Sequence, residues 1–372
     1  MKVIMTRSNS IAPDPRVEKE ARVLSAFANV TVLAWDRTGA LPDEEAKYAT
    51  IKRARIASGY GGVAILLKLV AFNYWLFFAL LFASFDILHA CDLDTGFTAM
   101  LVAKLRAKPV VYDMFDMYSE AASEILSPAA LAIALIAESW VVRNAAVTII
   151  VDEGRRKQLE RMQPKQVVVI YNSPEEVPIT ATSTGTLENK EVFYVGVLAK
   201  NRAFEYLIEA IVSVPGVKLT IGGFGSDEAF VKAEVEKFSD RATFIGKVPY
   251  DEVLQRSATA DILFALYDPR VKNHVYSSPN KLFEAMLLSK PIIVTDGTGM
   301  SDIVRRVGNG IIVEYGDAEA LSQAVRRLKD SNIAEKMGAR GREAYVAEFG
   351  WGIMSERLVS LYRNVSLSGG TR

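Results

Sequence analysis

The sequence contains very little cysteine or histidine. Cys91 is its single cysteine, and His89 and His274 are its two histidines among 372 residues. One cysteine excludes an intramolecular disulfide and a zinc site built on a cysteine cluster, and it is typical of a protein kept in a reducing compartment. The two histidines are too isolated in the sequence to indicate a metal cluster.

The sequence also lacks an excess of either charge and several common catalytic motifs. Lys plus Arg and Asp plus Glu number 44 each, so the basic surplus typical of a nucleic-acid-binding protein is missing. A Gly-x-Ser-x-Gly elbow, a His-Glu-x-x-His pair and a phosphate-loop lysine are absent as well. The apolar run in residues 1–7 is too short for a secretory signal, so we expect a cytoplasmic protein.

One long apolar segment, Val63–Phe85, is interrupted only by Lys68 and Asn73. As a helix it would extend roughly 34 Å, which is enough to cross a bilayer. Its apolar residues form no single stripe, so the helix is buried in a core, docks on a membrane or lipid acceptor, or spans a membrane. Strand-like segments on both sides, Thr50–Ile56 and Ile87–Ala90, argue against a span. We expect peripheral membrane contact, with a plain core helix as the alternative.

Half of the residues are apolar and about a quarter are charged, as in globular proteins, and the length suits two α/β domains. Short β-branched runs alternate with helical patterns, which predicts two parallel, doubly wound sheets with ligands at the carboxyl ends of their strands. The strands are expected at Val3–Met5, Val30–Leu33, Ile87–Ala90, Val110–Tyr112, Val147–Val151 and Val167–Ile170, and then at Val192–Val195, Leu219–Gly222, Thr243–Ile245, Ile262–Ala265, Ile292–Thr295 and Ile311–Val313.

A polar stretch rich in Thr, Ser and Glu separates the two alternating regions. We therefore expect an N-terminal domain at 1–172, a linker at 173–190 and a second domain at 191–348. Residues 349–372 are expected to form a final helix that packs back on the first domain. Two such domains are expected to enclose a deep cleft, where small molecules usually bind.

The most informative motif runs from Ser277 to Met286. Ser278 is a suitable N-cap and Pro279 a suitable first helical residue, so a helix is expected to begin there. Its free N–H groups and dipole favour an anion, and Lys281 in the first turn is easier to explain if an anionic ligand offsets its charge. Glu284, three residues later, can accept the hydroxyls of a ribose. The alternative is an ordinary capped helix with a surface Lys–Glu pair.

Two glycine-containing turns are weaker candidates for phosphate binding. Gly196 ends an expected strand, and Arg202 follows at a distance from which its planar guanidinium can bind phosphate oxygens. Gly222, Gly223 and Gly225 end the next strand, but they lack the full dinucleotide spacing, so NAD binding is not indicated. Ordinary turn chemistry also explains both segments.

In order and spacing, these segments resemble the family-4 retaining glycosyltransferases over nearly the whole chain. In the first half the resemblance rests on Pro13–Ala21, Ile87–Asp94 and Val111–Asp116. In the second half it rests on the Gly196 segment, Gly223 with Gly225, Phe244–Tyr250, the Lys281–Glu284 helix, Lys290–Ile293, and Asn309–Gly310 with Gly316–Asp317.

The resemblance implies a GT-B fold and a hexosyltransferase of the EC 2.4 class. Such an enzyme moves a sugar from a nucleotide-diphosphate sugar to a glycan or lipid-linked acceptor with retention of configuration, and it uses no metal or further cofactor. Carried over to this sequence, the catalytic group would be Arg202, Lys281, Glu284, Asp113 and Asp116, the two aspartates orienting the acceptor hydroxyl. The donor-binding residues would be Ser8, Gly196, Arg202, Gly223, Gly225, Lys247, Val248, Ser278, Asn280, Lys281, Leu282 and Glu284.

Three positions depart from the family pattern. Tyr276 stands where the family often has a sugar-binding glutamate, Val197 where it has an arginine, and Phe115 where it has a histidine on the acceptor side. A diverged subfamily explains all three changes. A sugar-nucleotide epimerase of the same fold and a catalytically inactive sugar-nucleotide-binding relative are the alternatives.

Overall fold

The computed structural model describes residues 1–58, 63–123, 126–176, 178–179 and 189–369, which form two compact units. Unit 1 comprises Met1–Tyr171 together with Met354–Arg372, and unit 2 comprises Asn172–Ile353. The expected linker at 173–190 lies largely outside the described residues. The chain thus leaves unit 1 once and returns to it in its last helix, α15 (Trp351–Gly369).

Unit 1 is built on an eight-stranded sheet within the described residues, with the order β3-β4-β2-β1-β5-β6-β7-β8. All neighbouring strands are parallel except β3 and β4, which pair antiparallel at the edge. The strands are β1 (Lys2–Arg7), β2 (Asn29–Asp36), β3 (Glu44–Ala46), β4 (Ala49–Arg55), β5 (Ile87–Cys91), β6 (Val110–Met114), β7 (Val147–Ile150) and β8 (Val167–Val169).

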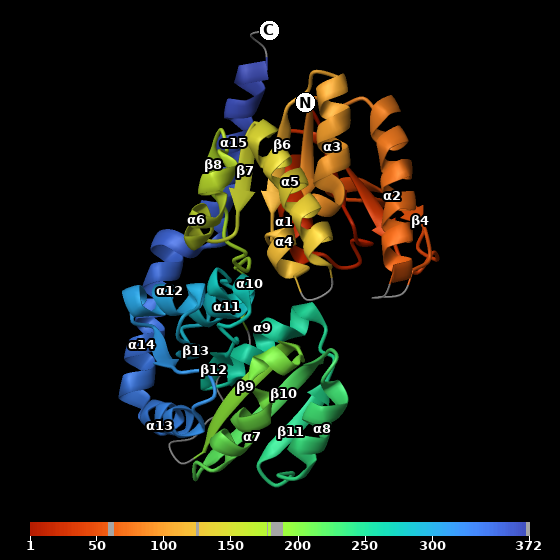
Figure 1. Cartoon of the computed structure of the whole chain (residues 1–372). Helices are drawn as coiled ribbons and strands as arrows, with labels where there is room; N and C mark the ends of the chain where they lie inside the picture. The colour runs from red at the N-terminus through yellow and green to blue at the C-terminus, as the bar shows by residue number, and fades with distance from the viewer. Residues whose placement is uncertain (59–62, 124–125, 177, 180–188, 370–372) are drawn as a thin grey trace. The chain divides into compact units, whose positions relative to one another are not determined.

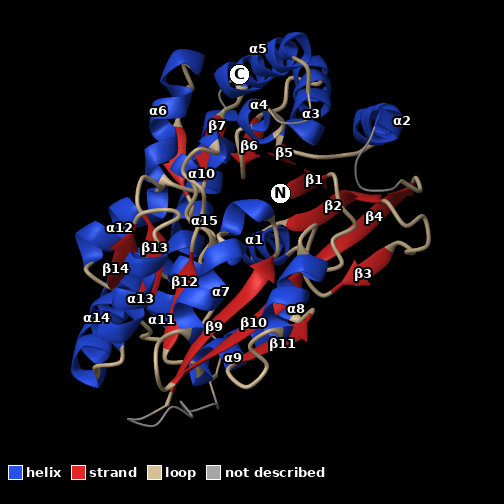
Figure 2. Ribbon diagram, turned by 60° about the horizontal axis from the view of Figure 1, so that its bottom comes forward, coloured by secondary structure: helices blue, strands red, loops and turns tan. Residues whose placement is uncertain are grey.

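Helices cover both faces of this sheet, as Figures 1 and 2 show. Strands β5 and β6 are buried along their whole length, as expected of central strands in a parallel sheet. The helices of unit 1 are α1 (Pro15–Ser25), α2 (Val63–Phe82), α3 (Leu93–Leu105), α4 (Tyr118–Ala121), α5 (Pro128–Asn144), α6 (Arg156–Leu159) and most of α15, with the short 3-10 turns η1 (Glu153–Arg155) and η2 (Glu160–Met162) beside α6.

Unit 2 has a six-stranded parallel sheet in its described part, with the order β11-β10-β9-β12-β13-β14. Its strands are β9 (Lys190–Val197), β10 (Val217–Phe224), β11 (Ala242–Gly246), β12 (Ile262–Ala265), β13 (Ile292–Thr295) and β14 (Gly310–Val313). The chain moves outward from β9 to β11 and then crosses back to β12. The strand order therefore reverses between β9 and β12, which is where ligands bind in open parallel sheets.

The helices of unit 2 pack on the two faces of this sheet. They are α7 (Phe204–Val212), α8 (Glu228–Glu236), α9 (Tyr250–Thr259), α10 (Lys272–Val275), α11 (Asn280–Leu287), α12 (Gly299–Val307), α13 (Ala318–Leu328) and α14 (Ser331–Ala344), with the 3-10 turn η3 (Lys200–Arg202) and a π-helical turn, η4 (Tyr345–Phe349). A continuous core joins β9, β10, α7 and α13 through residues such as Phe204, Leu207 and Leu328. The expected α/β class with two doubly wound sheets is confirmed.

Glu138 on α5 is a fully buried carboxylate that fixes the short helix α4. One carboxylate oxygen accepts from the amide of Tyr118 at 2.9 Å, and the other accepts from the Ser119 hydroxyl at 3.3 Å. Burial raises the pKa of Glu138 from 4.5 to about 7, although these hydrogen bonds oppose the shift. The folded protein therefore holds a proton at Glu138 more tightly than the unfolded chain does.

We expect Glu138→Gln to change how stability depends on pH. Because the folded-state pKa is raised, Glu138 lowers the free energy of unfolding as the pH rises from 4.5 to about 7. Glutamine does not titrate. The free energy of unfolding of the variant should therefore rise relative to that of wild type by up to about 3 kcal/mol across this window. Urea unfolding followed by tryptophan fluorescence measures this difference, since Trp35, Trp75 and Trp140 all lie in unit 1. The exposed Glu356→Gln on α15 is the control, and parallel profiles for wild type and Glu138→Gln would contradict the prediction.

Candidate functional site

Helix α11 begins with its amides uncapped by any side chain. The sequence predicted Ser278 as the N-cap and Pro279 as the first helical residue. That assignment is wrong by one position, because Pro279 has an extended backbone (φ −70°, ψ 160°) and α11 starts at Asn280. Proline carries no side-chain acceptor, so it leaves the first-turn N–H groups unoccupied by a cap. The Leu282 amide is the exception, since it donates to the Pro279 carbonyl at 3.0 Å, and the Leu282 side chain is fully buried in the core.

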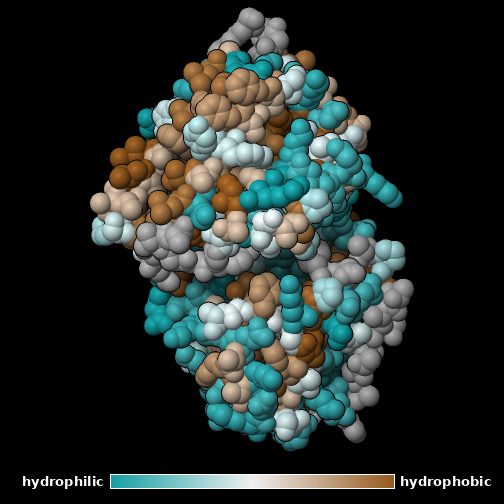
Figure 3. All heavy atoms as spheres, turned by 90° about the vertical axis from the view of Figure 1, so that its right-hand side faces the viewer, coloured by the Kyte–Doolittle hydropathy of each residue, from teal (hydrophilic) through white to brown (hydrophobic). Residues whose placement is uncertain are grey.

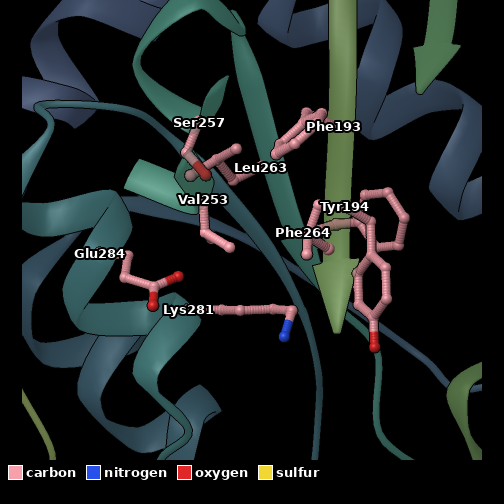
Figure 4. Close-up of a pocket in the computed structure, with 9 residues that line it drawn as sticks. Phe193, Tyr194, Val253, Ser257, Leu263, Phe264, Lys281 and Glu284 are labelled. Carbon is pink, nitrogen blue, oxygen red and sulfur yellow. The ribbon is translucent and has the colours of Figure 1, made fainter. Parts of the chain in front are cut away.

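Lys281 extends from the first turn of α11 toward the carboxyl end of β9 (Figure 4). Its Nζ lies 4.7 Å from the centre of the Tyr194 ring, and it occupies the space that a side chain at Gly196 would need. Burial lowers the pKa of Lys281; nearby Glu284 opposes this shift and Arg202 adds to it. A desolvated ammonium beside the positive end of a helix is stabilised by an anion placed there.

Glu284 lies one turn further along α11 and is 5% exposed. Together with Lys281 it lines a small pocket whose other walls come from β9, β12 and α9 (Figure 4). The apolar part of that wall includes Phe193, Leu263 and Val253. The spacing of three residues expected from the sequence thus brings a carboxylate and an ammonium to one pocket.

Arg202, at the end of η3, is held in place by neighbouring groups. Its Cζ lies 3.6 Å from the centre of the Tyr267 ring. Its Nη1 donates to Asn201 Oδ1 at 3.0 Å and contacts His274 Nε2 at 2.8 Å. The buried Nε has no hydrogen-bond partner within the described residues. A guanidinium held on one side and unpaired on the other is arranged to bind an acceptor from outside the protein.

His274, Tyr267 and Tyr194 were not predicted from the sequence as residues of this site. His274 was noted only as a histidine too isolated for a metal cluster. No sequence signal connects it with Arg202, 72 positions away, because the two meet only when η3 and α10 are folded against the end of the sheet.

Gly223 and Gly225 allow two strand-end loops to approach each other closely. Gly223 has a φ of +137° and Gly225 one of +158°, a region that favours glycine. A Cβ at Gly223 would collide with the Gly196 carbonyl oxygen, and one at Gly225 with the Leu198 carbonyl oxygen. Gly196 and Gly223 also pair in register across β9 and β10. The three predicted glycines therefore meet at one edge of the sheet.

The other predicted donor-binding residues of unit 2 surround the same edge. Lys247 and Val248 follow β11, and Lys247 Nζ lies 5.3 Å from the centre of the Phe224 ring. Ser278 is buried just before α11, and Asn280 opens that helix. The structure thus brings Lys281 and Glu284 beside β9 and β12, and Lys247 beside the carboxyl end of β10. Their roles in ligand binding stay predictions.

In unit 1, Asp113 is a structural ion-pair residue. Both its carboxylate oxygens bind Arg16, at 2.8 and 3.1 Å, and the residue has no exposed surface. Burial alone would raise the pKa of Asp113, but Arg16 and His89 hold it at about 2. The expectation that Asp113 directly orients an acceptor hydroxyl is therefore wrong for this conformation, because ligand cannot reach its oxygens.

The remaining candidates of unit 1 are closer to its surface. Asp116, after β6, has a half-exposed side chain and an ion pair with Arg155 at 2.8 Å. The Ser8 hydroxyl donates to Asp94 at 2.6 Å and lies largely buried after β1. Asp116 as an acceptor-orienting group and Ser8 as a donor contact both stay predictions.

One buried group in the described residues has the donor atoms of a metal site. His89, Cys91 and Asp113 each offer one ligand atom within 4.8 Å of the others. The donor set does not fit a cation, because Arg16 already neutralises Asp113 and burial raises the pKa of the Cys91 thiol well above its ordinary value. A metal needs the thiolate rather than the thiol.

Comparison with known families matches both units. Residues 14–173 match the family model described as "Glycosyl transferase 4-like domain", and residues 189–331 match "Glycosyl transferases group 1". Among solved structures, the fold is similar to sucrose-phosphate synthase from Thermosynechococcus elongatus, with a TM-score of 0.80 and 19% identity over 99% of this chain and 100% of that one. It is also similar to Anabaena HepE in complex with UDP-glucose, with a TM-score of 0.70 and 14% identity over 98% and 100% of the two chains.

Among curated relatives, a GDP-mannose-dependent monoacylated alpha-(1-6)-phosphatidylinositol monomannoside mannosyltransferase from Corynebacterium glutamicum is 28% identical over 206 residues, 52% of each protein. A glycogen synthase from Mycobacterium tuberculosis is 24% identical over 74% of this chain and 68% of that protein. The chain spans about half or less of the length of the first few relatives it matches.

We expect Gly223→Ala to destabilise unit 2 by at least about 2 kcal/mol, because its Cβ would strain a left-handed backbone and collide with a carbonyl that cannot move freely. The matched control is Gly352→Ala at the start of α15, where an added Cβ meets nothing within 4 Å. Thermal unfolding should show a large fall in Tm for the first variant and little change for the second. Equal Tm values would contradict the close approach of the two loops.

Proposed function

This chain belongs to the family-4 glycosyltransferases of the GT-B fold, and on that premise we propose that it transfers a sugar from a nucleotide-diphosphate sugar to a glycan or lipid-linked acceptor. It acts as a hexosyltransferase of the EC 2.4 class, retains the anomeric configuration and requires no metal. The observation that carries the proposal is the meeting of Lys281, Arg202 and Glu284 at the strand-order reversal of unit 2.

The donor diphosphate lies against the first turn of α11. Uncapped amides and the helix dipole attract an anion there, and Lys281 adds a full positive charge in a desolvated position. Arg202 adds its unpaired Nε from η3. Gly196 and Gly223 keep the opposite loops free of side chains, so the main chain can approach phosphate oxygens closely. Glu284 accepts the hydroxyls of the ribose.

The chemical contribution of these residues is electrostatic. As the bond between the anomeric carbon and the diphosphate oxygen breaks, negative charge grows on the departing nucleotide diphosphate. Lys281, Arg202 and the α11 amides are already oriented toward that charge, so little reorganisation is needed at the moment of reaction. Preorganised cations in a desolvated site stabilise the leaving group more strongly than water does. On the acceptor side, Asp116 orients the attacking hydroxyl.

The alternatives receive less support from the same residues. A sugar-nucleotide epimerase needs an acid and a base near the sugar. His274, the histidine of unit 2, contacts Arg202 and the Asp268 carbonyl through its two ring nitrogens and is not free for that role. A non-catalytic binding protein would keep the phosphate site, so only a transfer assay separates it from the enzyme.

We expect Lys281→Ala and Glu284→Ala each to weaken donor binding about 10- to 100-fold, since each removes a charged partner worth roughly 1.5–3 kcal/mol. Isothermal titration with UDP-glucose and GDP-mannose measures the affinity, and release of nucleotide measures turnover. Lys336→Ala, an exposed lysine on α14, is the matched control. Unchanged affinity and turnover in both site variants would overturn the assignment. Tight binding without turnover by wild type, with any acceptor tried, would favour the non-catalytic relative.

We also propose that residues 63–85 bring the protein to the cytoplasmic face of a membrane. Helix α2 turns Asn73 toward the rest of unit 1 and exposes several of its apolar residues. Asn73 faces α3, where it donates to the Asp94 carbonyl at 2.9 Å and accepts from the Thr98 hydroxyl at 2.6 Å. Phe72 stacks on Trp35 with ring centres 5.3 Å apart. Leu76 and Leu80 are fully buried on the same side, so the remaining apolar residues point outward.

The exposed apolar surface extends beyond α2, because α2 packs against α3 and α3 packs against α5. We call it the apolar face; it consists of Leu67, Val70, Tyr74, Phe78 and Phe82 on α2, Phe97, Leu101 and Leu105 on α3, and Ile133, Leu135 and Ile136 on α5. Figure 3 shows apolar side chains gathered on the upper left of that view. A contiguous apolar surface over three helices is typical of an interaction site rather than of ordinary scattered exposure.

Charge indicates an anionic bilayer as the occupant of the apolar face. Among the described side chains of α2, α3 and α5, the exposed charged residues are Lys68, Lys104 and Arg143, all basic. Basic residues beside apolar ones bind anionic lipid surfaces. A twofold contact with a second copy would instead bring like charges together. A membrane span would separate β4 from β5, yet both strands belong to one sheet.

We expect wild-type protein to float with vesicles of phosphatidylcholine and phosphatidylglycerol, and to float less with phosphatidylcholine alone. Ile136→Glu on α5 should weaken binding about tenfold, because it replaces an apolar contact of roughly 1.5 kcal/mol with a like charge. Val346→Glu, a 60% exposed position in unit 2, is the matched control. Equal flotation of Ile136→Glu and wild type would contradict the role of α5. A dimer that this substitution dissociates, without vesicle binding, would assign the apolar face to a second copy.

A further inference from the structure

His274 is buried in unit 2 with both ring nitrogens engaged. The residue is 5% exposed, its Nδ1 lies 2.9 Å from the Asp268 carbonyl oxygen, and its Nε2 lies 2.8 Å from Arg202 Nη1. Its ring also lies beside Tyr267, with centres 5.0 Å apart, and Tyr267 in turn carries the Arg202 guanidinium. His274 is therefore packed against the same aromatic ring as the cation that it contacts.

The two partners of His274 determine its protonation state. A carbonyl oxygen can only accept a hydrogen bond, so Nδ1 must carry a proton. A guanidinium can only donate, so Nε2 must be unprotonated and accept from Arg202. The ring is therefore neutral, with its proton on Nδ1. Protonation of Nε2 would replace the acceptor with a donor and place two positive groups 2.8 Å apart.

The charged groups nearest to His274 come from η3, from α11 and from its own segment. Arg202 from η3 is in direct contact, Lys281 from α11 lies near Arg202, and Arg270 and Lys272 stand four and two residues before His274 in the sequence. Asp268 is the nearby carboxylate, but its oxygens bind Arg270 at 2.7 and 2.9 Å. Proton uptake must therefore break the contact with Arg202 rather than strengthen it.

The Nε of Arg202 remains as a donor for a ligand. Asn201 and His274 together engage Nη1, whereas the buried Nε has no partner within the described residues. An unpaired buried donor costs roughly 1–3 kcal/mol unless a ligand satisfies it. The orientation of Nε depends on the groups that fix the other end of the guanidinium. Of the distances from Nη1 to those groups, the one to His274 is the shortest.

We propose that neutral His274 is a positioning residue that orients Arg202 toward the donor diphosphate, and that protonation of His274 releases Arg202 and weakens donor binding in acid. The inference rests on the donor site proposed above and deepens it, because it makes donor affinity dependent on pH through a residue that does not touch the donor. No bond is made or broken by His274 itself.

His274→Gln and His274→Ala test the proposal. The glutamine side-chain oxygen can reach the position of Nε2 and accept from Arg202, but it does not titrate, whereas alanine removes the acceptor. UDP-glucose and GDP-mannose are suitable probes because their diphosphates are diesters that stay ionised over the whole pH range of the experiment. Affinity is measured by isothermal titration at about pH 8 and about pH 5.5, on either side of the ordinary histidine pKa.

We expect wild type to lose about tenfold in affinity between the two pH values, His274→Gln to stay nearly constant, and His274→Ala to bind about tenfold more weakly at both. If His274 had only a structural role, its replacement by glutamine would not make donor affinity independent of pH. Identical pH profiles for wild type and His274→Gln would overturn the proposal, as would full affinity in His274→Ala at about pH 8. If wild type binds neither probe at either pH, the donor site itself is refuted instead.

Discussion

The first turn of α11 imposes the constraint on which the site of unit 2 depends. A helix that starts after proline has no side-chain cap, so its positive end remains electrostatically unsatisfied. Lys281 adds a desolvated cation to that end. Its side chain packs against β9, where only a glycine at position 196 leaves room for it. Gly223 must then approach Gly196 without a side chain of its own. The positive charge gathered at this turn is therefore costly in the free protein, and for this reason we propose an anionic ligand there.

Unit 1 places its charges differently, since it pairs several of them with one another in the core. Arg16 on α1 binds Asp113 on β6 and Glu20 on its own helix, both fully buried. His89 on β5 joins the group, and its Nδ1 lies 2.8 Å from the Tyr362 hydroxyl of α15. This network fixes the last helix to the first sheet. Such a buried network holds a fold together, and Asp113 is not available to an acceptor because both its oxygens bind Arg16.

Several features of the fold could be predicted because they depend on local patterns. Buried runs such as Val110–Tyr112 and Ile292–Thr295 indicated strands, and both lie in strands of the observed sheets. The edge strand β3 was missed, because Glu44–Ala46 is short and polar and pairs only through the neighbouring β4. The start of α11 was predicted one residue early, since a serine before a proline satisfies the usual rule while the backbone of Pro279 does not.

By itself the sequence determined the α/β class, the two alternating regions and the motif around Lys281 and Glu284, because each is written in the spacing of nearby residues. Only the tertiary structure decided which distant residues meet. It joined Arg202 to His274, enclosed Asp113 behind Arg16 and turned the apolar side of α2 outward while Asn73 faced α3. The physical reason is that the burial and pairing of side chains depend on how helices and strands pack together. The pattern along the sequence shows only which side chains each helix or strand carries.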